Sequence, residues 1–191
     1  MPFNLTDFRS QMVGQGARPT LFEVTLNFPT FVANGANAGR KATFMCQSAN
    51  LPGSSVGSIE LSYFGRKVKV PGDRTFDSWT VTIINDEDFA IRNSLENWMN
   101  SINSHAGNLR IPQTNVNNGY GANLLVKQYG KVGNVLKVVN FVGAFPTNVS
   151  AIDLSWETNN SIETYTCEFQ YQWWESVPST DGTTSSIARR I

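Results

Sequence analysis

The side chains that could carry out chemistry in this chain are few and lie in distant segments. His105 is the single histidine, and the two cysteines are Cys46 and Cys167. A zinc site needs several His or Cys ligands, and a nucleophilic triad needs a histidine beside its nucleophile. Because no second histidine is available, we expect no catalytic residue and no metal ligand here. Both cysteines fall in strand-like segments, so we expect small buried thiols in preference to a disulfide.

The densest acidic cluster is formed by Asp86, Glu87 and Asp88. Clustered carboxylates can hold a cation, but these fall where a strand ends and a helix is expected to begin. Carboxylates in the first turn of a helix complement its dipole, which gives them a sufficient structural role. Gly119-Tyr120-Gly121 lacks the spacing and the following lysine of a phosphate-binding loop. We therefore predict that this protein is not an enzyme and has no cofactor.

The overall charge excludes several classes of partner. Lys and Arg number 15, as do Asp and Glu, so the chain has no net charge that would gather nucleic acid or a membrane surface. Charged residues make up only 16% of the chain, against roughly 25% in typical soluble domains. No secretory signal is visible, and no apolar run approaches the roughly 20 residues that span a bilayer. We expect no membrane partner and synthesis in a reducing cytoplasm.

Three segments have the clearest periodicity. Residues 163–174 alternate strictly, with Tyr165, Cys167, Phe169, Tyr171 and Trp173 on one side and polar residues on the other. Residues 76–84 are rich in β-branched residues and predict a longer strand. Apolar residues at 91, 95, 98 and 102 predict one face of a helix, with Gly107 as its stop.

The remaining segments predict short strands and turns. We expect a short helix over 5–13 and strands over 21–28, 42–48, 59–63, 68–70, 124–129, 135–145 and 152–156. Turns are expected at Gly65-Arg66, at Pro71-Gly72-Asp73 and at Pro146-Thr147-Asn148, and a flexible hairpin tip at 33–39. The fold class is therefore mainly β, a sandwich or barrel of antiparallel strands with one flanking α-helix. Residues 1–175 form one domain, and 176–191 form a Ser/Thr/Gly-rich tail.

Several motifs give this chain a family resemblance. The most specific block is Gly72-Asp73-Arg74-Thr75-Phe76-Asp77, followed by Trp79-Thr80-Val81-Thr82 and Asn85-Asp86-Glu87. Further matching segments are Ala17-Arg18-Pro19, Cys46 to Pro52, Pro146 to Val149, and Leu154 with Trp156, and they occur in the same order. Together they resemble the tail tube proteins of contractile-tailed (myovirus-type) bacteriophages over residues 17–175. The segment 34–40 and the tail after Glu175 depart from the family's pattern.

The resemblance implies a structural virion protein with a phage tail tube-like fold. Six copies would form a ring, and rings would stack into a hollow tube inside a contractile sheath, which conducts DNA into the host. The implied partners are the sheath protein, the tape-measure protein, and baseplate or tail-terminator proteins. DNA would pass through without sequence-specific binding. The implied location is the virion tail, after synthesis in the host bacterial cytoplasm.

The alternation of polar and apolar residues leads to hypotheses about two surfaces. The expected channel-lining residues are Thr164, Thr166, Glu168, Gln170 and Gln172, followed by Thr43, Gln47, Glu60 and Ser62. The residues expected between rings are Leu51, Pro52, Val56, Pro71, Asp73 and Arg74.

Two alternatives remain open at this point. A baseplate tube initiator, or the inner tube of a bacterial contractile injection system, would share these motifs. A carbohydrate-binding β-sandwich would instead expose tryptophan and tyrosine on loops, whereas the tryptophans here fall mostly in the expected strands and helix.

Overall fold

The computed structural model describes residues 4–12, 14, 16–110 and 119–178. The expected mainly antiparallel β fold is confirmed, with nine strands and three helices in the described residues. The strands are β1 (Phe22–Thr25), β2 (Cys46–Ala49), β3 (Ser55–Tyr63), β4 (Arg66–Thr75), β5 (Trp79–Ile84), β6 (Ala122–Tyr129), β7 (Val135–Val149), β8 (Thr164–Gln170) and β9 (Trp173–Pro178). The helices are α1 (Leu5–Gln11), α2 (Gly35–Met45) and α3 (Ala90–Ile102).

Two sheets share the long strand β7. Its first half pairs with β6 and β9, and β6 pairs with β1, which forms sheet A. Its second half pairs with β8, followed by β5 and β2, which forms sheet B. Gly143 lies at the change of sheet with φ at +64°, and its N–H donates to Asn123 Oδ1 at 3.2 Å. A glycine here allows the left-handed backbone that the bend requires.

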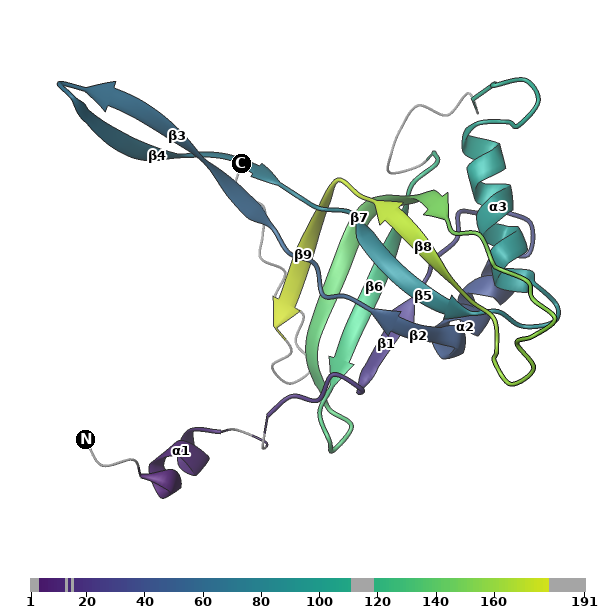
Figure 1. Ribbon diagram of the computed structural model, residues 1–191, viewed down its shortest axis with the longest axis horizontal. Coiled ribbons are helices and arrows are strands. Elements are labelled where there is room, and N and C mark those ends of the chain that lie inside the picture. Colours follow the sequence, from purple (N-terminus) through teal and green to yellow (C-terminus); the bar gives the residue numbers. More distant parts are fainter. Residues whose placement is uncertain (1–3, 13, 15, 111–118, 179–191) are drawn as a thin grey trace.

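The core lies between the two sheets and beneath α2 and α3 (Figure 1). Strict alternation on β5 and β8 buries Trp79, Val81, Ile83, Tyr165, Cys167 and Phe169. Trp79 stacks on Phe141 of β7 with ring centroids 4.4 Å apart, and its Nε1 donates to the Asn50 carbonyl at 2.7 Å. The expected helix face is confirmed too, because Ile91, Leu95 and Trp98 of α3 are buried and Ile102 is partly buried.

The segment expected as a hairpin tip and a strand is instead the helix α2. Its buried residues are all small, namely Gly35, Ala38, Gly39 and Ala42. A Cβ added at Gly39 would lie 2.6 Å from the Leu26 carbonyl oxygen, and one at Gly35 would lie 2.6 Å from the Phe28 Cβ. By composition these glycines are typical of a turn. They are instead required because α2 packs very closely on the segment that follows β1.

Four further expectations about local structure were wrong. Pro71-Gly72-Asp73 lies inside β4, and Pro146-Thr147-Asn148 lies inside β7 at a register shift. Residues 152–156 form no strand. The last expected strand is split, because β8 ends at Gln170 and β9 pairs with β7 in the other sheet, so that Trp173 is partly exposed. Proline is tolerated on edge strands and beside bulges, where its missing N–H interrupts no essential ladder hydrogen bond. Both prolines lie beside a register shift on a strand with an uncovered edge, which explains why they misled the prediction.

The ends of the helix α3 also differ from expectation. It begins at Ala90, after the acidic cluster, and it ends at Ile102, before Gly107. Residues 111–118, in the link between α3 and β6, lie outside the described residues, as does the tail beyond Pro178. The strand β9 extends three residues into the segment 176–191.

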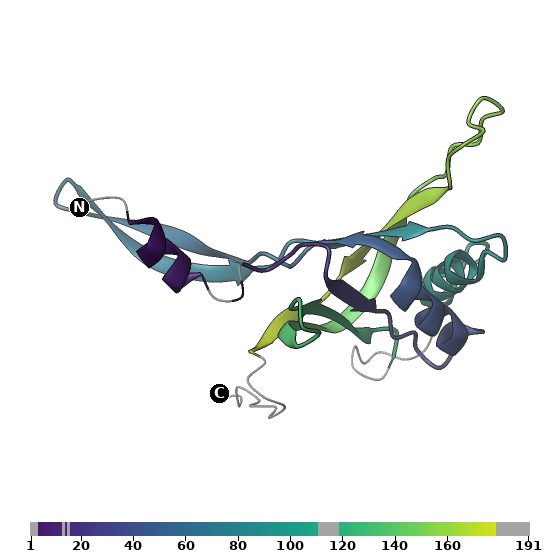
Figure 2. The ribbon, with the colours of Figure 1, turned by 90° about the horizontal axis from the view of Figure 1, so that it is seen from below.

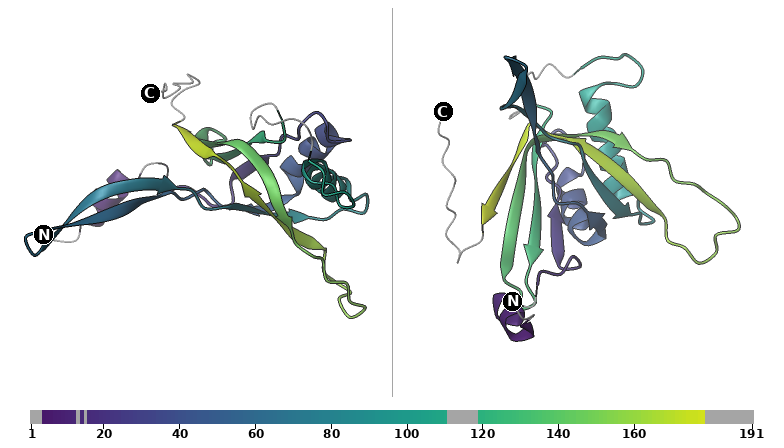
Figure 3. Two further views of the ribbon diagram at one scale, coloured as in Figure 1. Left: turned by 90° about the horizontal axis from the view of Figure 1, so that it is seen from above. Right: turned by 60° about the vertical axis from the view of Figure 1, so that its left-hand side comes forward.

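Two parts of the chain project from this body. The hairpin β3–β4 extends away from the two sheets, and α1 lies apart from them as well (Figures 1 and 2). The segment 150–163 between β7 and β8 projects in another direction (Figure 3). Among the described residues, no helix is long and apolar enough to span a membrane.

Candidate functional site

The outer face of sheet B is polar. Cross-strand register places Thr166 opposite Thr82, Glu168 opposite Thr80 and Thr82 opposite Ser48. On the other side of β8, Glu168 also lies opposite Asn148 of β7. We define the polar face of sheet B as Ser48, Thr80, Thr82, Asn148, Thr164, Thr166, Glu168 and Gln170. Glu168 is the only charged residue in this set, so the face is hydrophilic but nearly neutral.

The structure brings only part of the expected channel set together. Thr164, Thr166, Glu168 and Gln170 share the polar face of sheet B, and Gln172 follows it in the exposed link to β9. Gln47 is exposed on β2 at a register shift. Thr43 is in α2, where its hydroxyl donates to the Gly39 carbonyl at 3.3 Å, so its expected strand position was wrong. Glu60 and Ser62 lie on the projecting hairpin, away from sheet B.

Sequence reasoning missed four residues of this face, Ser48, Thr80, Thr82 and Asn148. The alternation of Thr80 and Thr82 with Trp79, Val81 and Ile83 was a sufficient signal for two of them. Nothing local indicated Ser48 or Asn148. Their position depends on register with β5 and β8, which are distant in sequence.

Sheet B has two uncovered edges. One is β2, which pairs only with β5, and the other is the outer edge of Phe145–Val149 in β7. Within the described residues no strand pairs with either edge. An uncovered edge presents unpaired N–H and C=O groups that favour pairing with another chain.

The hairpin β3–β4 is amphipathic although almost all of it is exposed. Ile59 lies opposite Val70 and Leu61 opposite Val68, so these residues form one apolar face together with Tyr63. The other face is polar, and on it Glu60 Oε2 accepts from Lys67 Nζ at 2.8 Å and Glu60 Oε1 lies 3.7 Å from Lys69 Nζ. An isolated two-stranded hairpin is marginally stable in water. The apolar face, which no described residue covers, is therefore a candidate contact surface.

The residues expected between rings gather at the base of this hairpin. Val56 lies opposite Arg74, Pro71 lies opposite Ser58, and Asp73 is exposed beside them. Leu51 and Pro52 lie in the link from β2 to β3. Near Gly57 the register shifts, and a Cβ added at Gly72 would lie 3.2 Å from the Gly57 carbonyl oxygen. The two backbones are thus in close contact where the hairpin leaves the body.

The two cysteines and the histidine have different surroundings in the described structure. Burial raises the pKa of the Cys46 thiol to about 12, and it raises the pKa of Cys167 further. A protonated thiol is a poor nucleophile and a poor metal ligand. Both cysteines are free, and His105 is exposed after α3, where its backbone N–H donates to Asn100 Oδ1 at 3.0 Å. In the described part of the chain, no three His, Cys, Asp or Glu side chains are placed to hold a metal ion.

Two carboxylates of the acidic cluster form ion pairs with a lysine of α2. Lys41 Nζ of α2 lies 2.6 Å from Asp86 Oδ2 and 2.5 Å from Asp88 Oδ2. Hydrogen bonds from Lys41 lower the pKa of both carboxyl groups, and the same bonds raise the pKa of Lys41. Asp88 Oδ1 also accepts from the Ala90 N–H at 3.0 Å, at the start of α3. The cluster therefore connects α2 to α3, a contact that the sequence did not indicate.

Comparison with known proteins identifies relatives over most of the chain. The family described as phage tail tube protein matches residues 17–177. The tail tube protein gp19 of Enterobacteria phage T4 is 34% identical over 167 residues, which cover 85% of this chain and 93% of gp19. The tail tube protein of Serratia phage KSP90 is 28% identical and covers 87% of this chain and 93% of its own length.

Two solved structures have a similar fold. A chain of the anti-feeding prophage cap superposes with a TM-score of 0.62 at 17% identity, over 86% of this chain and 92% of that chain. A chain of the PVC sheath-tube complex, an extracellular contractile injection system, gives a TM-score of 0.59 at 18% identity, over 89% and 97%.

Proposed function

This chain belongs to the phage tail tube protein family, and from that premise we propose that six copies close into a ring whose channel is lined by the polar face of sheet B. The function is structural, as a component of the virion tail. Family membership supports a non-enzymatic role. The chain is made in the host bacterial cytoplasm before it assembles.

The observation that supports ring closure best is sheet B itself. Its inner face is packed with buried residues, its outer face is polar, and both of its edges are uncovered in the described chain. Pairing the β2 edge of one copy with the β7 edge of the next would satisfy these backbone groups. Repetition of that contact around a closed ring forms a continuous β-barrel, which has no edges.

The polar face of sheet B suits a channel through which DNA slides. Cationic side chains bind phosphate and release counterions, which gives the affinity that holds a protein on DNA. This face presents threonine, serine and amide groups with a single carboxylate. It therefore keeps the channel wall hydrated without binding the DNA phosphates. DNA passes in contact with water and hydroxyl groups and is not recognised by sequence.

Rings stack into a tube through the projecting hairpin β3–β4. Its base holds Val56, Pro71, Asp73 and Arg74, which are all exposed, and Leu51 and Pro52 lie in the link from β2 to β3. The tube lies inside a contractile sheath. The sheath protein, the tape-measure protein, and baseplate or tail-terminator proteins are its partners.

Electron microscopy of the purified chain tests this proposal. We expect rings of six copies that stack into hollow tubes, with Thr166 and Glu168 on the inner wall in a reconstruction. Dispersed monomers at high concentration, or a ring with the polar face of sheet B turned outward, would contradict it.

A further inference from the structure

The segment 150–163 between β7 and β8 exposes apolar side chains to an unusual extent. Trp156 is 100% exposed, Leu154 is 81% exposed and Ile162 is 75% exposed. The segment has local order, since Thr158 Oγ1 donates to the Ser155 carbonyl at 2.9 Å and the Glu157 N–H donates to Ser155 Oγ at 3.2 Å. We call it the Trp156 loop. Three large apolar side chains that are exposed to solvent on a locally ordered segment indicate a contact surface.

The Trp156 loop is acidic, whereas the hairpin is basic. Residues 150–163 hold Asp153, Glu157 and Glu163 and no basic residue. Residues 55–75 hold four basic residues and two acidic ones. Lys67 and Lys69 are engaged by Glu60, but Arg66 and Arg74 make no ion pair with any described residue. Asp153 and the Glu157 carboxylate likewise have no ion-pair partner among the described residues.

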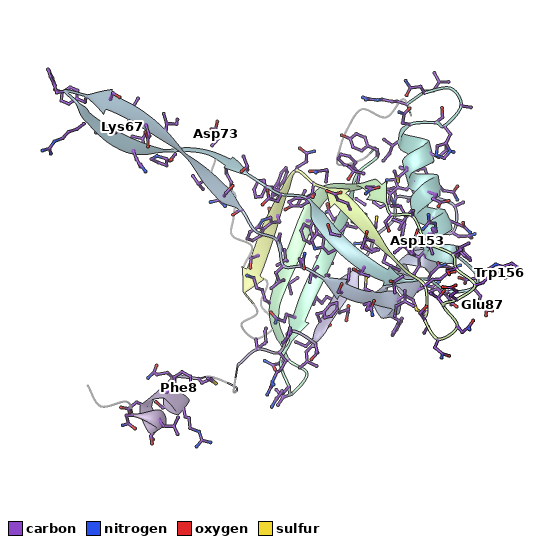
Figure 4. The ribbon with its side chains drawn as sticks, in the orientation of Figure 1. Phe8, Lys67, Asp73, Glu87, Asp153 and Trp156 are labelled. Carbon is purple, nitrogen blue, oxygen red and sulfur yellow. The ribbon has the colours of Figure 1, made fainter. Side chains whose placement is uncertain are left out.

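Both surfaces also combine charge with exposed apolar groups. Arg66 lies directly opposite Tyr63 and therefore on the apolar face of the hairpin. At the tip, Phe64 is 91% exposed and has φ at +44°, a left-handed conformation that is unfavourable for a bulky residue. A strained aromatic residue that is exposed to solvent points to a functional role. The Trp156 loop likewise combines an aromatic residue, Trp156, with a charged residue, Asp153 (Figure 4).

The two surfaces lie at opposite ends of the molecule (Figures 2 and 3). They cannot meet within one chain, and their charges and apolar groups are complementary. We propose that the hairpin β3–β4 of one copy docks on the Trp156 loop of a copy in the next ring. This inference rests on the proposed stacking of rings, and it names the second surface of that contact.

This pairing is heterologous, because two different surfaces of the same chain meet. Such a contact does not close on itself along an axis and generates an open polymer. The tube then has two different ends, one presenting free hairpins and the other free Trp156 loops. A protein that ends the tube at the hairpin side presents acidic and apolar groups, and one at the other side presents basic and apolar groups.

Charge reversal tests the pairing. The loop-reversed variant carries Asp153→Lys and Glu157→Lys, and the hairpin-reversed variant carries Arg66→Glu and Arg74→Glu. Each variant alone places like charges together, so the concentration at which its rings stack rises by about tenfold or more. In an equal mixture every contact between the two kinds of ring is again complementary, and tubes of alternating rings form. Native mass spectrometry follows the rings, and negative-stain microscopy follows the tubes.

The matched control gains two lysines elsewhere, through Glu87→Lys and Val132→Lys, and stacks as the wild type does. If both reversed variants stack as the wild type does, the Trp156 loop serves another protein and the inference is overturned. Loss of stacking that the mixture does not restore overturns it as well. In either case the rings remain, so the proposed ring stands. If the wild type forms no ring, both the proposed function and this inference fail.

Discussion

At the scale of single residues, glycine explains why α2 can pack where it does. Gly39 faces the Leu26 carbonyl oxygen at a distance that leaves no room for a methyl group. A carbonyl in the backbone cannot move aside as a flexible side chain could, so the helix or the segment after β1 must shift.

We therefore predict that Gly39→Ala lowers the free energy of unfolding by about 1–3 kcal/mol, as overpacking does in other cores. Urea unfolding of the unassembled chain measures this. Gly53→Ala is the control, because an added Cβ there has no atom within 4 Å. Equal stability of the two variants would show that α2 is not held by this close approach.

A second residue-scale prediction concerns Glu23. Its Oε2 accepts from Tyr129 Oη at 2.6 Å and its Oε1 accepts from Lys127 Nζ at 3.0 Å. The Tyr129 hydrogen bond and then Lys127 lower the pKa of Glu23 from its ordinary 4.5, and Glu23 raises the pKa of Tyr129 to about 12. The stabilisation by ionised Glu23 is thus present above pH 4.5 and is lost as the pH falls through the lower folded pKa. The stabilisation from protonated Tyr129 is present below pH 10 and is lost as the pH rises towards about 12.

We expect Glu23→Gln to lower stability near neutral pH by about 1 kcal/mol. The variant also lacks the loss of stability below pH 4.5 and above pH 10 that the wild type owes to Glu23 and Tyr129. Urea midpoints measured across pH for the wild type and the variant test it. Glu87→Gln is the control, because the Glu87 carboxylate has no hydrogen-bond partner in the described chain. A variant with the same pH profile as the wild type would contradict the role of Glu23.

At the scale of elements, β3–β4 and β5 differ in what stabilises them. The strand β5 is central in sheet B and carries three fully buried side chains, whereas both strands of the hairpin are exposed along nearly their whole length. Local stability follows burial, so the hairpin opens at a much lower free energy than the sheets.

Hydrogen exchange should therefore separate the free chain from the assembled tube. In the free chain, we expect backbone amides of residues 55–75 to exchange quickly and those of β5 and β8 slowly. In tubes the hairpin becomes protected because a neighbouring copy covers it, while β5 changes little and serves as the internal reference. Fast exchange in the hairpin after assembly would contradict its role as a contact.

At the scale of the whole molecule, the proposed channel would meet DNA with the near-neutral polar face of sheet B. We predict that Thr166→Lys slows DNA ejection from virions that carry it, since every subunit then adds one cation to the wall. Added salt relieves the delay because phosphate contacts release counterions. Val132→Lys, with the same change in charge on the turn between β6 and β7, leaves the rate unchanged. Unaltered ejection with Thr166→Lys would place this face outside the channel.

Local pattern alone was enough for several parts of the fold and of the candidate site. Alternation over residues 163–171 predicted which side of β8 is buried and which is polar, and the spacing of Ile91, Leu95 and Trp98 predicted the buried face of α3. Equal numbers of acidic and basic residues already argued against a DNA-binding surface. These features depend on the geometry of one strand, one helix or a sum of charges, all of which are contained in neighbouring residues.

Only the tertiary structure decided the rest. The glycines of α2 look like turn formers until the neighbouring chain at Leu26 and Phe28 is in place, and Pro146 looks like a stop until β8 pairs with β7. Ile59, Leu61 and Trp156 look like core residues, yet they are exposed on projections, where we propose that another copy covers them. The physical reason is the same each time. Whether a residue is buried, bends the chain or meets a partner depends on atoms far away in the sequence, and local periodicity carries no record of them.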